Sequence, residues 1–210
     1  MTEYHKIQSL FKRDMSRPHK PLIEGQWTRP EFEFLADNTW TFTEKVDGTN
    51  IRVIFENGVV SFGGRTDAAE IPSFLFARLE RRFLPMVVAL AELFDSGPVV
   101  LYGEGYGARI QKIGALYRPD VDFVLFDVRV DRWWLQRDDV EDVAAKLGLD
   151  VVPVIGEGTL HDAVARAKAG IRSTWGDFEA EGIVARPKIE LCTRSGKRLI
   201  AKIKCRDFAI

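Results

Sequence analysis

The fold is decided by the stretch Trp40–Phe55, which reads Trp-Thr-Phe-Thr-Glu-Lys-Val-Asp-Gly-Thr-Asn-Ile-Arg-Val-Ile-Phe. Up to Lys45 the residues alternate as in a β-strand, with Trp40 and Phe42 on one face and the threonines and the lysine on the other. Asp47 and the glycine after it favour a tight turn, and a second apolar strand follows. The sequence therefore places a lysine at a strand-to-turn junction, pointing away from the apolar face.

The dipeptide Asn57-Gly58 predicts a two-residue hairpin between that second strand and residues 59–62. A type I′ turn needs positive φ at both central residues, which asparagine and glycine tolerate best. Counting cross-strand pairs back from the turn, Val53 faces Phe62 and Asn50 faces Arg65. An arginine is thus expected at the open end of the hairpin, beside the lysine loop.

Composition predicts an ordinary globular protein with one main domain. The chain has 210 residues, of which 46% are hydrophobic and 29% charged, and its formal net charge is -1, so any surface for nucleic acid must be local. No run reaches the roughly 18 apolar residues of a membrane-spanning helix, and no signal peptide is evident, so a cytoplasmic protein is expected. Cys192 and Cys205 have neither disulfide-scaffold nor zinc-site spacing.

The rest of the chain reads as mixed helices and strands around this stretch. Residues 1–39 are predicted to be an N-terminal extension packed on a domain formed by residues 40–210. The apolar periodicity predicts helices over residues 72–94, broken at Pro85, over 138–147, closed by Gly148, and over 160–171, capped by Thr159. Strands are expected at residues 98–102, where a glycine-rich run follows, and at 123–130, 181–186 and 198–205. In the last strand, Lys202 and Lys204 share one face.

The lysine loop carries a resemblance to a known superfamily. Lys45-Val-Asp-Gly resembles the Lys-x-Asp-Gly signature of the covalent nucleotidyltransferases, the polynucleotide ligases and mRNA capping enzymes. Thr49-Asn50 and Arg65 are similar to the ATP-dependent RNA ligases of the phage RNA ligase 2 type. Further family motifs follow in order: Tyr-Gly-Glu104-Gly, Leu-Phe126-Asp-Val, Glu181-Gly-Ile-Val and Lys202-Ile-Lys204. Six collinear matches from about residue 40 to 206 are far more specific than any one of them.

The resemblance implies a fold class and a domain organisation. The expected fold is α+β, an ATP-grasp-like nucleotidyltransferase (ligase adenylation) domain over residues 40–210, with antiparallel sheets flanked by short helices. The sequence departs from the family in ending at Ile210, which leaves no room for the C-terminal domain that many ligases carry. How the protein grips a polynucleotide is therefore open, and a protein partner that supplies this grip is one alternative.

The resemblance also implies roles for individual residues. Lys45 would be the nucleophile that carries AMP, Glu104 would bind the ribose hydroxyls, Phe126 and Ile183 would enclose the purine, and Glu44 would neighbour the adenine. The catalytic set is Lys45, Asp47, Arg65, Lys202 and Lys204, and the nucleotide-binding set is Glu44, Asn50, Arg65, Glu104, Phe126, Ile183, Lys202 and Lys204. Glu181 would bind Mg²⁺ or Mn²⁺.

Elementary chemistry explains why these residue types belong together. A lysine attacks phosphorus only as the neutral amine, which desolvation and neighbouring cations favour. Phosphoryl transfer depends mainly on positioning and on neutralising charge, which Arg65, Lys202 and Lys204 would supply. A carboxylate such as Glu181 is a suitable ligand for a hard divalent cation.

The leading functional interpretation is an ATP-dependent RNA ligase that joins 5′-phosphate and 3′-hydroxyl ends through lysyl-AMP. A DNA ligase and a guanylyl-transferring capping enzyme remain alternatives, as does a catalytically idle module that binds nucleotides or RNA ends. The basic segment 186–206 is a candidate for contacts to RNA phosphates. Nicked duplexes and single-strand ends remain open as substrates.

Overall fold

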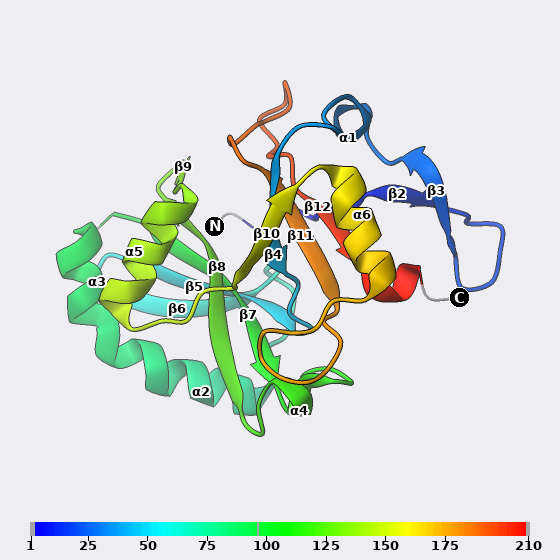
Figure 1. Ribbon diagram of the computed structural model, residues 1–210. Helices are drawn as coiled ribbons and strands as arrows, with labels where there is room; N and C mark the ends of the chain where they lie inside the picture. The colour runs from blue at the N-terminus through cyan, green and yellow to red at the C-terminus, as the bar shows by residue number, and fades with distance from the viewer. Residues whose placement is uncertain (1–2, 96, 209–210) are drawn as a thin grey trace. The chain divides into compact units, whose positions relative to one another are not determined.

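The computed structural model describes residues 3–95 and 97–208, and the chain forms two compact units (Figure 1). Unit 1 comprises Asp47–Val152 and the described part of Met1–Tyr4, and unit 2 comprises His5–Val46 and Pro153–Ile210 up to residue 208. The chain therefore passes from unit 2 into unit 1 between Val46 and Asp47, one residue after Lys45. Each unit has its own sheet and apolar cluster.

Unit 1 is built on a five-stranded antiparallel sheet in the order β6-β5-β7-β8-β9. The strands are β5 (Thr49–Glu56), β6 (Val59–Gly64), β7 (Val99–Gly107), β8 (Val121–Val130) and β9 (Trp133–Trp134). The predicted hairpin is confirmed, because Glu56 pairs with Val59 and Val53 with Phe62. Asn57 and Gly58 have φ angles of 52° and 75°, the two positive values that a type I′ turn requires.

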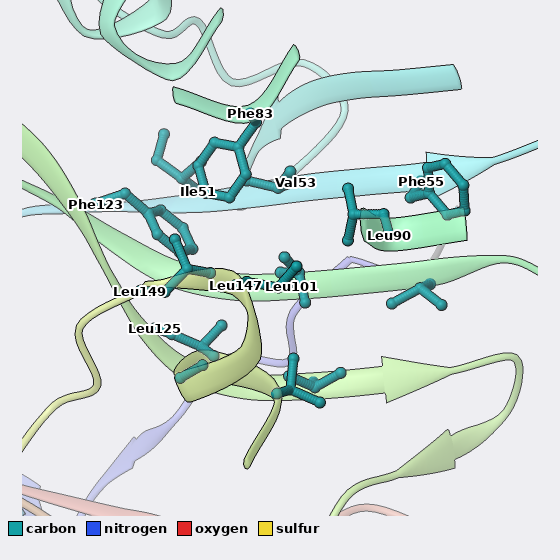
Figure 2. Packing of buried hydrophobic residues seen from close by; sticks show 14 of the residues in the cluster. Ile51, Val53, Phe55, Phe83, Leu90, Leu101, Phe123, Leu125, Leu147 and Leu149 are labelled. Carbon is teal, nitrogen blue, oxygen red and sulfur yellow. The ribbon is translucent and has the colours of Figure 1, made fainter. Parts of the chain in front are cut away.

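Short helices cover the apolar face of the unit 1 sheet. They are α2 (Ser73–Phe83), the 3₁₀ turn η1 (Leu84–Met86), α3 (Val87–Phe94) and α5 (Arg137–Leu147). A further short helix, α4 (Gly114–Tyr117), follows β7. The helical region breaks around Pro85 as predicted, and α5 ends at Gly148 with a left-handed φ of 61°. Figure 2 shows Phe83 of α2 and Phe123 of β8 meeting over this sheet, with ring centroids 5.2 Å apart.

The strand expected at residues 98–102 continues through the glycine-rich run 103–107, which lies inside β7. A side chain at Gly103 would lie 2.2 Å from the ring of Phe123, and one at Gly105 would lie 2.6 Å from Leu75. Because neither glycine has a side chain, Phe123 and Leu75 can pack directly against the backbone of β7. Glu104 lies between them and extends from the opposite face of the strand.

Unit 2 contains a second five-stranded sheet in the order β1-β12-β11-β4-β10. The strands are β1 (Gln8–Ser9), β12 (Ala201–Lys204), β11 (Gly182–Pro187), β4 (Trp40–Glu44) and β10 (Val154–Gly158). All neighbours are antiparallel except β1 and β12, which are parallel. β2 (Phe11–Arg13) and β3 (Leu22–Trp27) form a separate antiparallel pair. The unit also contains α1 (Pro30–Phe34), α6 (Leu160–Ala169) and the 3₁₀ turn η2 (Cys205–Asp207).

Helix α6 (Leu160–Ala169) covers the apolar face of the unit 2 sheet (Figure 1). Its N-terminus forms a capping box between Thr159 and Asp162, so the predicted cap is confirmed. The helix ends two residues earlier than expected, because Gly170 adopts a φ of 81°, a conformation that stops the helix.

The N-terminal segment contributes strands and core side chains to unit 2. Leu10, Phe11 and Phe32 are almost fully buried and share one cluster with Trp40 and Phe42. The boundary at residue 39 between an N-terminal extension and the main domain stays a prediction. No described helix has the length and apolar character needed to cross a membrane.

Candidate active site

The Lys45 amine lies in a three-residue ion cluster within unit 2. Its Nζ donates to Oε2 of Glu181 at 2.5 Å, and Nζ of Lys204 approaches Oε1 of the same carboxylate at 2.5 Å. The side chains of Lys45, Glu181 and Lys204 are 21%, 9% and 17% exposed. One carboxylate thus bridges two amines at a site that still has access to solvent.

Strand alternation explains why these side chains meet. Trp40 and Phe42 of β4 are fully buried in the core of unit 2, so Lys45, which has the opposite parity, extends from the other face. Lys45 continues the register of β4 through its backbone N–H, which donates to the carbonyl of Gly182 at 2.9 Å. On β12, Ile203 is buried in the core while Lys202 and Lys204 are half-buried on the opposite face, as predicted.

Gly182 allows Glu181 to reach the lysine face. Regular alternation from Ile183, which is in the core, would direct Glu181 toward the core side as well. Gly182 instead has a φ of 152°, and a Cβ on it would lie 2.0 Å from the carbonyl oxygen of Ile203. Only glycine fits this position. The change in backbone direction at Gly182 lets the side chain of Glu181 contact both lysines.

The charges of the cluster influence one another. Burial raises the pKa of Glu181, but the Lys45 and Lys204 amines outweigh that effect and hold the pKa below its ordinary value of 4.5. Burial lowers the pKa of Lys202, and the positive charges of Lys204, Lys45 and Lys6 lower it further. The site therefore carries excess positive charge that an anionic ligand would neutralise.

The lowered pKa of Glu181 predicts a stability difference that depends on pH. Because the folded-state pKa lies below the free value of 4.5, the ion cluster stabilises unit 2 above that value, and this contribution is lost as the pH falls through the folded-state pKa. The variant Glu181→Gln is therefore expected to be less stable than wild type at neutral pH, with the difference shrinking below pH 4.5. Urea unfolding of both proteins over this pH range measures it.

The variant Glu24→Gln is a suitable control for this measurement. Glu24 also pairs with a lysine at 2.5 Å, but its side chain is 53% exposed, so water and salt screen the pair. Its stability difference from wild type is expected to be small throughout. A Glu181→Gln difference that stays constant or grows as the pH falls contradicts the expected sign.

Glu44 holds a loop of unit 2 through a fully buried carboxylate. Its Oε1 accepts a hydrogen bond from Ser173 Oγ at 2.6 Å, and its Oε2 accepts bonds from the backbone N and Oγ1 of Thr174, both at 2.8 Å. The side chain is directly opposite Ile183 on β11 and shares its face. These bonds fix the segment between α6 and β11, and no sequence pattern around Glu44 indicates this tertiary role.

Replacing Glu44 by alanine is expected to destabilise unit 2. The change leaves the buried hydroxyl of Ser173 without its acceptor and removes both hydrogen bonds from the exposed Thr174, at a cost of about 1–3 kcal/mol in the free energy of unfolding. The matched control is Glu157→Ala on β10, whose side chain is 43% exposed and pairs with Lys188, so a loss below about 1 kcal/mol is expected. Chemical denaturation measures both, and equal losses would contradict the anchoring role of Glu44.

Ile183, expected beside the purine, is fully buried among the core residues of unit 2. Its neighbour Val184 is half-buried and pairs directly with Lys202 on the lysine face. The changed backbone direction at Gly182 thus places Val184, and not Ile183, on the face of Lys202 and Lys204. The contact of Ile183 with the purine stays a prediction.

The polar candidates of unit 1 lie on β5 and β7 or directly beside the ends of β5 and β6. Asn50 pairs directly with Glu104 across these strands. Within the described part of the chain, Asn50 Oδ1 is buried without a hydrogen-bond partner. Asp47 lies on the loop before β5, and its backbone N–H donates to Tyr117 Oη at 3.3 Å. Arg65 is exposed directly after β6, consistent with the register expected from the hairpin.

Phe126 lies at an irregularity of β8. Tyr102 pairs with Asp127 while Gly103 pairs with Leu125, so Phe126 is the extra residue of a β-bulge. Its ring meets that of Tyr4 edge-on, with centroids 5.1 Å apart, and Tyr4 Oη donates to Asp127 Oδ2 at 2.9 Å. A bulge redirects a side chain, which no local sequence signal revealed here.

The basic segment 186–206 is only partly available to a ligand. Arg198 is buried and forms an ion pair with Glu190, and Lys188 pairs with Glu157 at 2.8 Å. Arg194 and Lys197 are exposed in the turn that precedes β12. Arg194 and Lys197 therefore remain as candidates for the contacts to RNA phosphates that this segment was expected to make.

Within residues 3–95 and 97–208, no group of three or more His, Cys, Asp or Glu side chains is placed to hold a metal ion. Glu181 is the carboxylate of the lysine cluster, and both of its oxygens contact amines. A divalent cation at this place would need further oxygen ligands from a bound molecule.

Comparison with known proteins assigns the family. A family model described as RNA ligase matches residues 38–204, most of the chain and every motif discussed above. The chain belongs to the RNA ligase family. The comparison with curated proteins gives no match.

Solved structures of Naegleria gruberi RNA ligase share the fold of this family member. An apo variant superposes with a TM-score of 0.64 at 21% identity, over 85% of this chain and 53% of that one. A variant with ATP and manganese gives a TM-score of 0.65 at 19% identity, over 95% and 58% of the two chains. The chain thus spans slightly more than half the length of these structures. A mixed α+β fold with mainly antiparallel sheets is confirmed.

Proposed function

We propose that this member of the RNA ligase family is an ATP-dependent enzyme that joins RNA ends through lysyl-AMP. The observation that carries the proposal is the contact of the Lys45 amine with the Glu181 carboxylate, which Lys204 also contacts. These residues occupy three of the motifs that resemble the covalent nucleotidyltransferases. The resemblance and the family match together favour an ATP-grasp-like adenylation fold.

The proposed reaction has three steps. The neutral amine of Lys45 attacks the α-phosphorus of ATP, and a P–N bond forms as the bond to pyrophosphate breaks. A 5′-phosphate oxygen of RNA then attacks the lysyl-AMP phosphorus and releases the lysine. Finally a 3′-hydroxyl attacks the adenylylated end, which forms the phosphodiester and releases AMP.

Within unit 2, three groups would assist the first step. Glu181 orients the Lys45 amine through the 2.5 Å contact. Lys204 and Lys202 would neutralise the phosphate charge, and the lowered pKa of Lys202 is consistent with a cationic field that lacks an anion. Val184 lies on the same face and would contact the base.

Within unit 1, the proposed contacts to the nucleotide follow the resemblance. Glu104 and Asn50, paired across β7 and β5, would serve the ribose, and Phe126 would stack on the purine. Arg65 would contact a phosphate, and Asp47 would belong to the catalytic loop. Glu44 would act on the adenine indirectly, through the loop that its carboxylate holds.

A divalent cation fits this donor set only together with a nucleotide. Glu181 offers one carboxylate, and magnesium in proteins is commonly held by one or two carboxylates plus substrate phosphates. The bound cation would supply charge neutralisation on the phosphates. Solved variants of Naegleria gruberi RNA ligase carry ATP or AMP with manganese, which supports the choice of nucleotide and metal.

Mass spectrometry after incubation with a nucleotide and Mg²⁺ or Mn²⁺ tests the proposal. A mass gain of one AMP from ATP, mapped to Lys45, is the expected result. A gain from GTP alone would favour the capping reaction, and no gain would favour a binding module without catalysis. Sealing assays on matched RNA and DNA strands separate an RNA ligase from a DNA ligase.

A further inference from the structure

A basic pocket of about 750 Å³ lies wholly within unit 2 and begins at the lysine cluster. It is lined by Lys202 and Lys204 of β12, by β1, by the segments on either side of β1, and by the η2 turn. Because Lys204 also contacts Glu181, and Glu181 contacts Lys45, the pocket adjoins the proposed nucleophile.

The lining of this pocket suits a polyanion. Five cationic side chains face a single carboxylate, that of Asp207, although the whole chain carries a net charge of -1. Asp207 is engaged by Arg13 at 2.5 Å. None of the salt bridges among residues 3–95 and 97–208 involves Lys6, Lys202 or Arg206. Local positive charge of this kind attracts phosphates.

The basic pocket continues into a second cationic hollow. Its volume lies within the roughly 300–1,000 Å³ of pockets for drug-sized ligands. A second hollow of about 130 Å³ shares Lys6 and Gln8 with it and adds Arg29 and Lys197. Cationic groups therefore continue from Lys204 past β1 into the second hollow, an arrangement that suits the successive phosphates of a strand.

We propose that this basic pocket holds the backbone phosphates of the 5′-phosphate-bearing RNA strand, with the 5′ end at Lys204. The inference rests on the proposed function, because transfer of AMP requires the 5′-phosphate to reach lysyl-AMP on Lys45. The strand would run along the edge strand β1, where the side chains of Gln8 and Ser9 offer hydrogen bonds to the sugar.

The double variant Lys6→Ala with Arg206→Ala tests this assignment in the full 210-residue chain. Both side chains are exposed, and neither belongs to the lysine cluster. Fluorescence anisotropy with a labelled, 5′-phosphorylated single RNA strand is expected to show about tenfold weaker binding. The log–log salt slope should fall by roughly 1.4, since each contact to a single strand contributes about 0.7.

The matched control is Lys12→Ala with Arg81→Ala, which removes one exposed lysine and one exposed arginine outside the pocket. Its affinity and slope should equal those of wild type. Unfolding curves of both variants verify that the fold is kept. Lysyl-AMP formation from ATP should stay within about twofold of wild type in both variants, because these residues serve the RNA strand.

Three results would overturn the pocket assignment. The first is unchanged RNA affinity and an unchanged salt slope in the Lys6/Arg206 variant. The second is loss of lysyl-AMP formation with unchanged RNA binding, which would assign the pocket to the triphosphate tail of ATP. The third is equally tight binding of a DNA strand of the same sequence. Failure of the proposed function looks different. In that case the wild-type chain forms no lysyl-AMP, while RNA binding still depends on Lys6 and Arg206.

Discussion

Replacing Lys45 by alanine is expected to abolish transfer of AMP from ATP to the chain, by roughly four orders of magnitude or more. The amine of Lys45 is the proposed attacking group, and neither Lys202 nor Lys204 can substitute for it, because both extend from a different strand, β12. The fold should survive, because the side chain lies off the core face of β4 and remains 21% exposed. Mass spectrometry after incubation with ATP and metal gives the readout.

Two comparisons sharpen this test of Lys45. Lys188→Ala removes an exposed lysine of unit 2 that pairs with Glu157 and should leave AMP transfer intact. The Lys45→Ala protein should still seal an RNA strand that has been adenylylated chemically, because the lysine acts as a nucleophile only in the first step. An adenylylated Lys45→Ala protein would refute the assignment of the nucleophile.

Replacing Gly182 by alanine is expected to destabilise unit 2 by roughly 3 kcal/mol or more and to abolish AMP transfer as well. The φ of 152° is unfavourable for any residue with a side chain, and the added Cβ would lie 2.0 Å from the carbonyl oxygen of Ile203. Relief of this overlap requires β11 and β12 to separate, which would also move Glu181 away from the Lys45 amine. Denaturant unfolding and the AMP-transfer assay measure the two effects.

The variant Gly196→Ala separates backbone strain from steric overlap. Gly196 has a φ of 75°, and a Cβ there would have nothing within 4 Å. It should therefore cost only about 1 kcal/mol and leave AMP transfer unchanged. Equal effects of the two substitutions would mean that the contact with Ile203 does not constrain β11.

Local signals in the sequence predicted much of the fold. The Asn57-Gly58 turn, the break at Pro85 and the helix stop at Gly148 each follow from the φ preferences of one or two residues, and the structure confirms all three. The orientation of Lys45 followed in the same way from strand alternation. These features need no knowledge of distant contacts.

Features that depend on distant residues could not be predicted. The parallel pairing of β1 with β12 joins the two ends of the described chain, and a strand of two residues carries no periodicity. The hydrogen bonds of Glu44 depend on a loop near residue 173. Whether Ile183 or Val184 lies on the lysine face depends on the φ of Gly182. Glycine tolerates so many conformations that its φ cannot be predicted from the sequence.

The chain order of the two units has a consequence for protein synthesis. Unit 1 consists almost wholly of the continuous stretch Asp47–Val152, whereas unit 2 combines His5–Val46 with residues that follow Pro153. During translation β4 therefore emerges long before its partners β10 and β11, and its buried aromatic residues remain uncovered meanwhile. The lysine acquires its carboxylate neighbour only after residue 181 has been made, so the nucleophile should be among the last parts of the protein to mature.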